Sequence, residues 1–248
     1  MPRIRAILRL RHLTIAAMES YRSALIVGAG SGLSASLTRL LRKEGLTVAL
    51  AARDSAKLSG LCKETGAIAF SCDATDASAV DQLFTNVEKA QGAPDVVIYN
   101  ASFRTRGPFV DLIAEDVQRA LQISVFGAFL VAQQATRRML TKQHGALLFT
   151  GASASVKGYA QSAPFAMGKF ALRGLAQSLA RELSPQGIHV AHFVIDGAIR
   201  SATRAEDPGK PDSMLDPDAI ALTYVNILRQ PRSAWSWEVE VRPWVERF

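Results

Sequence analysis

The stretch that most constrains the fold of this chain is ALIVGAGSGLS, residues 24–34, in which a short apolar run meets three closely spaced glycines and then continues with helical periodicity. The pattern predicts a strand, a tight turn and the start of a helix. One face of that helix is apolar and consists of Leu33, Leu37, Leu40 and Leu41. Glycine at Gly28, Gly30 and Gly32 permits positive φ and close approach of a ligand, and the N–H groups at the helix start favour an anion such as pyrophosphate. Because turns that are glycine-rich only for packing look the same, this turn alone does not establish a dinucleotide site.

The rest of the chain alternates apolar runs with amphipathic stretches, without repeats or linkers. The predicted strands are Ala24 to Val27, Thr47 to Ala51, Ala67 to Ser71, Asp95 to Tyr99, Ala146 to Thr150, Ile188 to Ile195 and Val239 to Val241. The runs are continuously apolar and are separated by segments long enough for helical crossovers. We therefore predict an α/β fold, a doubly wound parallel sheet of about seven strands with helices on both faces (a Rossmann fold).

Composition excludes some function classes. The net charge of +7 includes four arginines within the first 17 residues, and without these four the balance is +3. No basic cluster interleaved with aromatic residues follows, so we expect no nucleic-acid partner. Cys62 and Cys72 are too few for a disulfide framework and suit no metal site, which favours two free thiols in a reducing cytoplasm and no bound metal.

The segment MPRIRAILRLRHLTIAA at the start alternates arginines with apolar residues. Its apolar runs are too short and too charged to span a bilayer. A targeting peptide and a membrane-surface helix remain alternatives, but we favour a disordered extension or an over-long start assignment. The expected organisation is a basic extension over residues 1–20 and a single dinucleotide-binding and catalytic domain over residues 21–248, with no membrane partner.

Two predicted helices, around Val117 to Leu140 and Phe165 to Leu183, are more apolar than contact with one sheet requires. Such surplus apolar surface is typical of helices that also pack against another subunit. We expect a homodimer or a homotetramer.

Motifs at the predicted strand ends resemble the single-domain short-chain dehydrogenase/reductase family. GAGSGLS resembles its glycine-rich turn, YNAS at Tyr99 to Ser102 stands in place of Asn-Asn-Ala-Gly, and DGAIRS at Asp196 to Ser201 replaces its Pro-Gly motif. The resemblance covers Ser23 to about Ser201 and implies a nicotinamide cofactor. The cofactor-binding residues that it implies are Gly28, Ser31, Gly32, Leu33, Arg53, Asp73, Ala74, Asn100, Ala101, Lys169, Gly197, Ile199 and Ser201.

Charge at the end of the second strand indicates which cofactor is bound. An acidic residue there would bind the ribose 2′-hydroxyl and repel a 2′-phosphate, but the position is Ala52, followed by Arg53. A permanently charged planar guanidinium suits phosphate, so we predict NADP(H) in preference to NAD(H). The alternative for Arg53 is that it pairs with Asp54 at a solvated helix start. The resemblance implies that Asp73, after the third strand, contacts the adenine, and the alternative is an ordinary turn or N-cap residue.

The resemblance also implies an active site of Asn, Ser, Tyr and Lys, in which tyrosine and lysine are spaced Tyr-x-x-x-Lys. Here the matching stretch is PFAMGK, with Lys169 one helical turn after Phe165. Phenylalanine has no hydroxyl and cannot exchange a proton with a substrate oxygen. Ser124 stands where the asparagine is expected, and Ser124, Ser153 and Lys169 are the predicted catalytic residues.

The serine position is ambiguous. The family serine aligns best with Ala152, and Ser153 is one residue away. Thr150 and Ser155 offer further hydroxyls, although hydroxyls are common in loops for turn chemistry alone. Tyr159 is the nearest other phenol, six residues before Phe165.

Two function classes remain. The first is an NADP(H)-dependent oxidoreductase that acts on a small carbonyl, alcohol or activated double bond and takes its proton from Ser153, Tyr159 or water held by Lys169. The second is an NADP(H)-binding protein with little or no turnover. General acid catalysis supplies about 10²- to 10⁴-fold, so loss of the phenol leaves hydride positioning available and favours the enzyme. Arg106, Arg200 and Arg204 are candidates for contact with an acidic substrate group, but solvated arginines near loops are common, and no substrate class follows.

Overall fold

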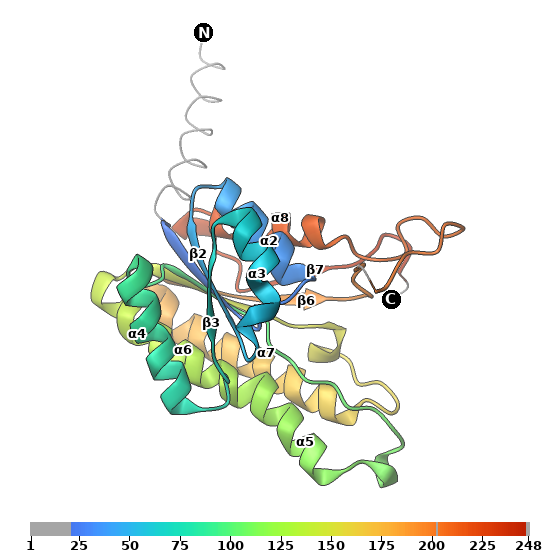
Figure 1. Ribbon diagram of the computed structural model, residues 1–248. Helices are drawn as coiled ribbons and strands as arrows, with labels where there is room; N and C mark the ends of the chain where they lie inside the picture. Colours follow the sequence, from blue (N-terminus) through green and yellow to red (C-terminus); the bar gives the residue numbers. More distant parts are fainter. Residues whose placement is uncertain (1–20, 202, 247–248) are drawn as a thin grey trace.

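The computed structural model describes residues 21–201 and 203–246, and the basic segment 1–20 lies outside them. The described residues contain a parallel sheet of seven strands in the order β3-β2-β1-β4-β5-β6-β7 (Figure 1). The strands are β1 Ser23–Val27, β2 Thr47–Ala52, β3 Ile68–Ser71, β4 Val96–Tyr99, β5 Gly145–Thr150, β6 Ile188–Ile195 and β7 Glu238–Val241. Every predicted strand is confirmed, with bounds that differ by at most one residue.

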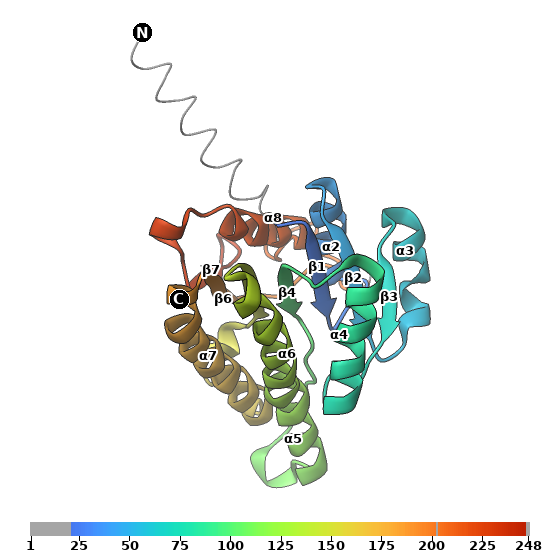
Figure 2. The same ribbon diagram turned by 90° about the vertical axis from the view of Figure 1, so that its left-hand side faces the viewer.

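Helices cover both faces of the sheet, as Figure 2 shows along a second direction. The α-helices are α2 Leu33–Lys43, α3 Ser59–Thr65, α4 Ala77–Gln91, α5 Ala114–Leu121, α6 Gly127–Lys142, α7 Ala163–Leu183 and α8 Pro217–Leu228. Helices α2 and α8 pack on one face, and α4, α6 and α7 pack on the other (Figures 1 and 2). The predicted doubly wound fold is therefore confirmed.

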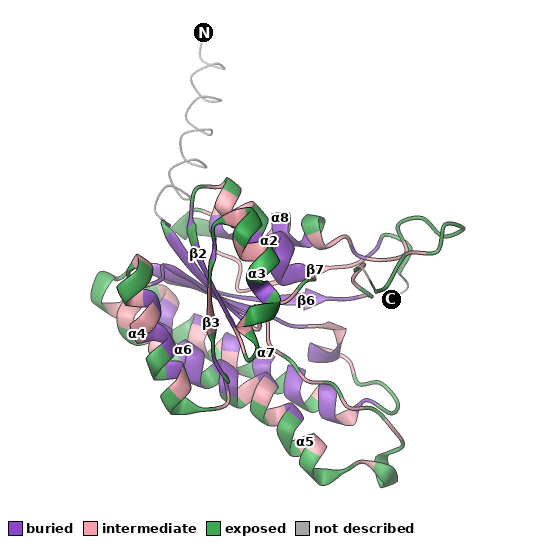
Figure 3. Cartoon of the chain, in the orientation of Figure 1, coloured by how far each residue is buried: buried purple, intermediate pink, exposed green. Residues whose placement is uncertain are grey.

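The core consists of two layers, one on each side of the sheet, because successive residues of a strand point to opposite faces. Ile26 of β1 packs with Leu37 and Tyr224 on the α2 and α8 side. Leu25 packs with Phe84 on the α4 side. Figure 3 shows the sheet as the most continuously buried part of the molecule, so both faces of each central strand are apolar.

The long helical segment predicted from Val117 is interrupted by a π-helical turn, Gln122–Phe126, between α5 and α6. A π turn accommodates one extra residue within a helix, and such turns are frequent at functional sites. Apolar periodicity does not reveal it, because the buried pattern continues on both sides. None of the helices in the described part of the chain is long and apolar enough to cross a membrane.

Candidate functional site

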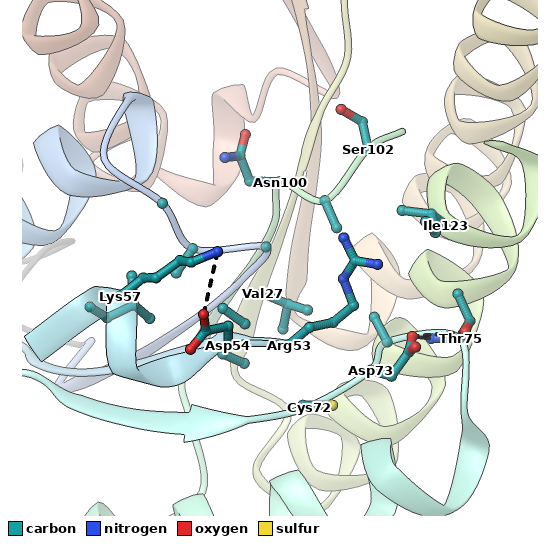
Figure 4. Close-up of a pocket in the computed structure, with 18 of the residues that line it drawn as sticks. Val27, Arg53, Asp54, Lys57, Cys72, Asp73, Thr75, Asn100, Ser102 and Ile123 are labelled. Carbon is teal, nitrogen blue, oxygen red and sulfur yellow. Dashed lines mark hydrogen bonds and ion pairs between the residues drawn. The ribbon is translucent and has the colours of Figure 1, made fainter. Parts of the chain in front are cut away.

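The carboxyl ends of β1, β2, β3 and β4 enclose a pocket of about 790 Å³ (Figure 4). Seven predicted cofactor-binding residues line it: Gly28, Ser31, Arg53, Asp73, Ala74, Asn100 and Ala101. Parallel strands present their carboxyl ends at one edge of the sheet, which brings together residues far apart in the sequence. This pocket is the candidate cofactor site.

Gly28 is required by the close approach of β1 and β4. Its φ is +84°, and a Cβ added there would lie 2.3 Å from the backbone nitrogen of Ala101. A Cβ at Gly30 or Gly32, by contrast, would meet no atom within 4 Å. Gly28 therefore packs against the backbone that follows β4, while Gly30 and Gly32 face open space.

The N-terminus of α2 is prepared for an anion. Its first turn has no acidic residue, and no side chain caps the helix at Gly32. The unsatisfied N–H groups of a helix start bind anions such as phosphate. The Ser34 hydroxyl instead donates to the Gly28 carbonyl at 3.2 Å and accepts from Asn100 Nδ2 at 2.7 Å, which ties the turn to β4.

The side chain of Arg53 extends into the pocket from the end of β2 (Figure 4). Both Arg53 and Asp54 are described, and no ion pair joins them; Asp54 pairs with Lys57, whose Nζ lies 3.3 Å from Oδ2. The solvated Arg53–Asp54 pair is therefore not what the structure shows. Lys57 also lines the pocket and adds a second cation that the strand-end argument missed, because it lies five residues beyond the end of β2.

Asp73 lines the pocket and also forms a turn. Its Oδ1 accepts from the backbone N–H of Thr75 at 2.9 Å and from the Thr75 hydroxyl at 2.8 Å, and these bonds lower the pKa of Asp73. Both roles weighed for Asp73 are thus compatible. Burial, together with Asp73 and Asp76, raises the pKa of neighbouring Cys72 to about 11, so this thiol is unreactive.

Six predicted cofactor residues lie outside the lining of this pocket. Gly32 and Leu33 begin α2, and the side chain of Leu33 is buried in the core. Gly197, Ile199 and Ser201 follow β6, and Ile199 forms a bridge to Leu215. Lys169 is on α7, beside the end of β5. Lys169, Gly197, Ile199 and Ser201 therefore belong to the other end of the sheet edge, where β5 and β6 finish.

Lys169 is buried, with 3% of its surface exposed, and its Nζ donates to the Thr150 carbonyl at 2.7 Å. Burial, and secondly the charge of Arg104, lowers the pKa of Lys169 to about 8. Phe165 lies one turn earlier, with its ring centroid 5.8 Å from Nζ. The spacing predicted from PFAMGK therefore places both side chains on one helix face.

Ser124 lies in the π-helical turn and packs against α7. A Cβ added at Gly168 would lie 3.2 Å from Ser124 Oγ, so the two helices meet closely beside Lys169. Ser124 is 1% exposed. A hydroxyl here is held next to the turn that carries Phe165 and Lys169.

The hydroxyls after β5 have different roles. Thr150 Oγ1 bonds to the Tyr224 hydroxyl at 2.8 Å within the core. Ser155 Oγ accepts from the Ala152 N–H at 3.1 Å and lies 3.2 Å from His192 Nε2. The hydroxyl of Ser153 has no such bond to another described residue, which leaves Ser153 as the available one in this loop.

Ser155, His192 and Glu238 form a hydrogen-bonded series, buried at Ser155 and His192, that resembles a hydrolase triad in connectivity only. His192 Nδ1 lies 3.1 Å from Glu238 Oε2, and burial lowers the pKa of His192 to about 4. Ser155 is 0% exposed, and Glu238 also pairs with Arg173 at 2.6 Å. These three side chains therefore fix the loop between β5 and α7, and Ser155 is not a nucleophile for a substrate.

Three further positions that the sequence singled out lie in the segments that follow β5 and β6. Asp196, where the family has proline, is buried and pairs with Lys157 at 2.9 Å. Arg200 pairs with Asp216 at 2.5 Å, so its charge is compensated by a carboxylate of the chain. Tyr159 is 44% exposed in the loop before α7.

Titration of Lys169 leads to a stability prediction. Its folded-state pKa, about 8, lies below the ordinary value of 10.5, so the charged form costs stability at pH below 8. This cost disappears as pH rises from about 8 to 10.5, because the unfolded chain then binds the extra proton. We expect the free energy of unfolding of the natural protein, relative to Lys169→Met, to rise across that window in urea titrations. A constant difference between the two proteins would contradict a depressed pKa.

Comparison with known proteins agrees with this geometry. A family model described as short chain dehydrogenase matches residues 22–210. The 3-oxoacyl-(acyl-carrier-protein) reductase MabA of Mycobacterium tuberculosis is 33% identical over 187 residues, which are 75% of this chain and 73% of that protein. A short-chain dehydrogenase structure from Rhodopseudomonas palustris is 32% identical, with a TM-score of 0.77 over 90% of this chain and 99% of that one. A metagenomic short-chain oxidoreductase in complex with NADP is 25% identical, with a TM-score of 0.79 over 90% of this chain and 97% of that one.

Proposed function

The chain belongs to the short-chain dehydrogenase/reductase family, and from this premise we propose that it is an NADP(H)-dependent oxidoreductase. Its substrate is a small carbonyl compound, alcohol or activated double bond. The observation that carries the proposal is a pocket lined by the glycine-rich turn that leads into the uncapped N-terminus of α2 and by Arg53, which forms no ion pair with a described residue. NADP(H), when bound, supplies or accepts the hydride.

Different residues bind different parts of NADP(H) in this proposal. The turn at Gly28 and the start of α2 hold the pyrophosphate, and Arg53, with Lys57 nearby, meets the 2′-phosphate. Asp73, Ala74, Asn100 and Ala101 enclose the adenosine part. Gly197, Ile199 and Ser201 lie where the nicotinamide end would extend.

We place the exchange of a proton with the substrate oxygen near Lys169. We place Ser153 and Ser124 as hydrogen-bonding groups for the substrate oxygen or for a water molecule beside it. Lys169, fixed by the Thr150 carbonyl, orients the nicotinamide ribose and stabilises negative charge on oxygen. An NADP(H)-binding protein without turnover is the second candidate, and the absence of a hydroxyl at Phe165 favours it.

Cofactor preference gives the test of the pocket. NADPH is expected to bind more tightly than NADH, because only NADPH brings a phosphate to Arg53. A charged hydrogen bond contributes about 1.5 to 3 kcal/mol, so Arg53→Ala is expected to remove most of the preference, roughly 10-fold or more. Fluorescence titrations of both cofactors measure this preference. Arg39→Ala is the control, because Arg39 pairs with Glu64 and does not line the pocket. Equal affinities of the unmutated protein for NADPH and NADH would contradict the proposed role of Arg53 in selecting NADP(H).

We further propose a cytoplasmic homodimer or homotetramer. Both cysteines are free thiols, as suits a reducing compartment. Helices α6 and α7 expose large apolar side chains, with Phe129 42% and Phe170 45% exposed. Light scattering at micromolar concentration is expected to give a closed oligomer, and Phe129→Glu with Phe170→Glu to give monomers. A monomer before mutation would contradict this assembly.

A further inference from the structure

An arginine occupies the position beside Phe165. Arg104, in the loop after β4, places its guanidinium carbon 4.0 Å from the centroid of the Phe165 ring. The same ring lies 5.8 Å from Lys169 Nζ. Phe165 is 7% exposed, so its ring is a buried platform with a guanidinium stacked on it.

The loop that carries Arg104 is anchored on both sides. Phe103, the preceding residue, stacks with Arg119 of α5 at 4.7 Å. The Gly107 N–H donates to the Gln161 carbonyl at 3.1 Å, which ties the loop to the segment before α7. Arg104 is therefore held at the N-terminal end of α7.

Positive charge gathers around this guanidinium without an acidic partner. Partial desolvation, followed by the charges of Arg106 and Arg204, lowers the pKa of Arg104, whose side chain is still accessible from solvent. Within residues 21–201 and 203–246, these three arginines form no ion pair, whereas Arg200 in the same region pairs with Asp216. Like charges that converge without compensation favour an anionic ligand.

We propose that Arg104, assisted by Arg106 and Arg204, binds a carboxylate of the substrate, so that the substrate class is an anionic oxo, hydroxy or unsaturated acid. This rests on the proposed oxidoreductase function. A guanidinium whose face is on an aromatic ring keeps its N–H edge free, and that edge matches a carboxylate in a bidentate pair. Phenylalanine at position 165 provides this platform without a hydroxyl.

The test uses benzoate and its uncharged counterpart benzamide, titrated into the protein with and without saturating NADP⁺. Benzoate is expected to bind more tightly than benzamide, and Arg104→Gln to weaken benzoate roughly 10-fold or more. Arg104→Lys, which keeps the charge but loses the fork, is expected to recover only part of the affinity. The control is Arg181→Gln, the same loss of charge at an exposed position near the far end of α7.

Each outcome bears on one claim. Unchanged benzoate affinity in Arg104→Gln, equal affinity for benzamide, or no benzoate binding would overturn the inference. Tighter binding of phenyl phosphate than of benzoate would replace the carboxylate by a phosphate group. Cofactor titrations separate the failure of this inference from the failure of the proposed function. Absence of NADPH binding by the unmutated protein would count against the proposed function and not against the anion site.

Discussion

Phe165→Tyr is expected to create or raise carbonyl reduction by roughly 10²-fold or more, the usual contribution of a positioned general acid. The new hydroxyl joins a ring whose centroid is already 5.8 Å from Lys169 Nζ. The ammonium stabilises the ionised phenol and lowers its pKa, which prepares it for proton transfer near neutral pH. Only one oxygen is added, so the steric cost is small.

The measurement is NADPH oxidation by both proteins against one panel of aldehydes, ketones and enones. The double variant Phe165→Tyr with Lys169→Ala is the control, because it has the phenol without the cation. It is expected to lose most of the gain. An inactive tyrosine variant that still binds NADPH would mean that Phe165 does not stand in place of the lost acid, or that the pocket does not present a carbonyl.

Gly28→Ala is expected to abolish cofactor binding. The φ of +84° costs a residue with a Cβ about 1 to 2 kcal/mol, and the added carbon would overlap the backbone of Ala101 at 2.3 Å. The turn must move away from β4, which displaces the groups that face the pyrophosphate. We expect roughly 100-fold or more loss of NADPH affinity, together with a lower Tm.

Gly60→Ala is the matched control, because Gly60 is in α3 and a Cβ there would meet no atom within 4 Å. It is expected to bind NADPH normally and to be slightly more stable, since alanine favours helices. Isothermal titration and thermal melts measure both variants. Normal NADPH affinity in Gly28→Ala would show that the cofactor does not bind at this turn.

The sequence predicted the sheet well because the central strands are largely apolar on both faces and are followed by recognisable turns. Those ends also located Arg53, Asp73 and Asn100, since residues that follow parallel strands converge at one edge. Which hydroxyl after β5 is available could not be predicted. That choice depends on Tyr224 and His192, which are distant in sequence and engage Thr150 and Ser155.

Arg104 was missed for a similar reason. An arginine in a loop has no periodicity that indicates its contacts, and its partner Phe165 is 61 residues further along the chain. The π-helical turn at Ser124 was missed because buried residues continue through it. Contacts across the fold, rather than local pattern, decide these features.

Hydride transfer from labelled cofactor is the most direct test of the proposed oxidoreductase function. The unmutated protein is mixed with NADPH carrying deuterium at nicotinamide C4, in either stereochemical form, and with oxo acids and enoic acids beside neutral carbonyl compounds. We expect NADPH oxidation and deuterium in a reduced product for at least one acidic substrate. Bound NADPH that stays unoxidised across the whole panel would contradict it and favour a cofactor-binding protein without turnover.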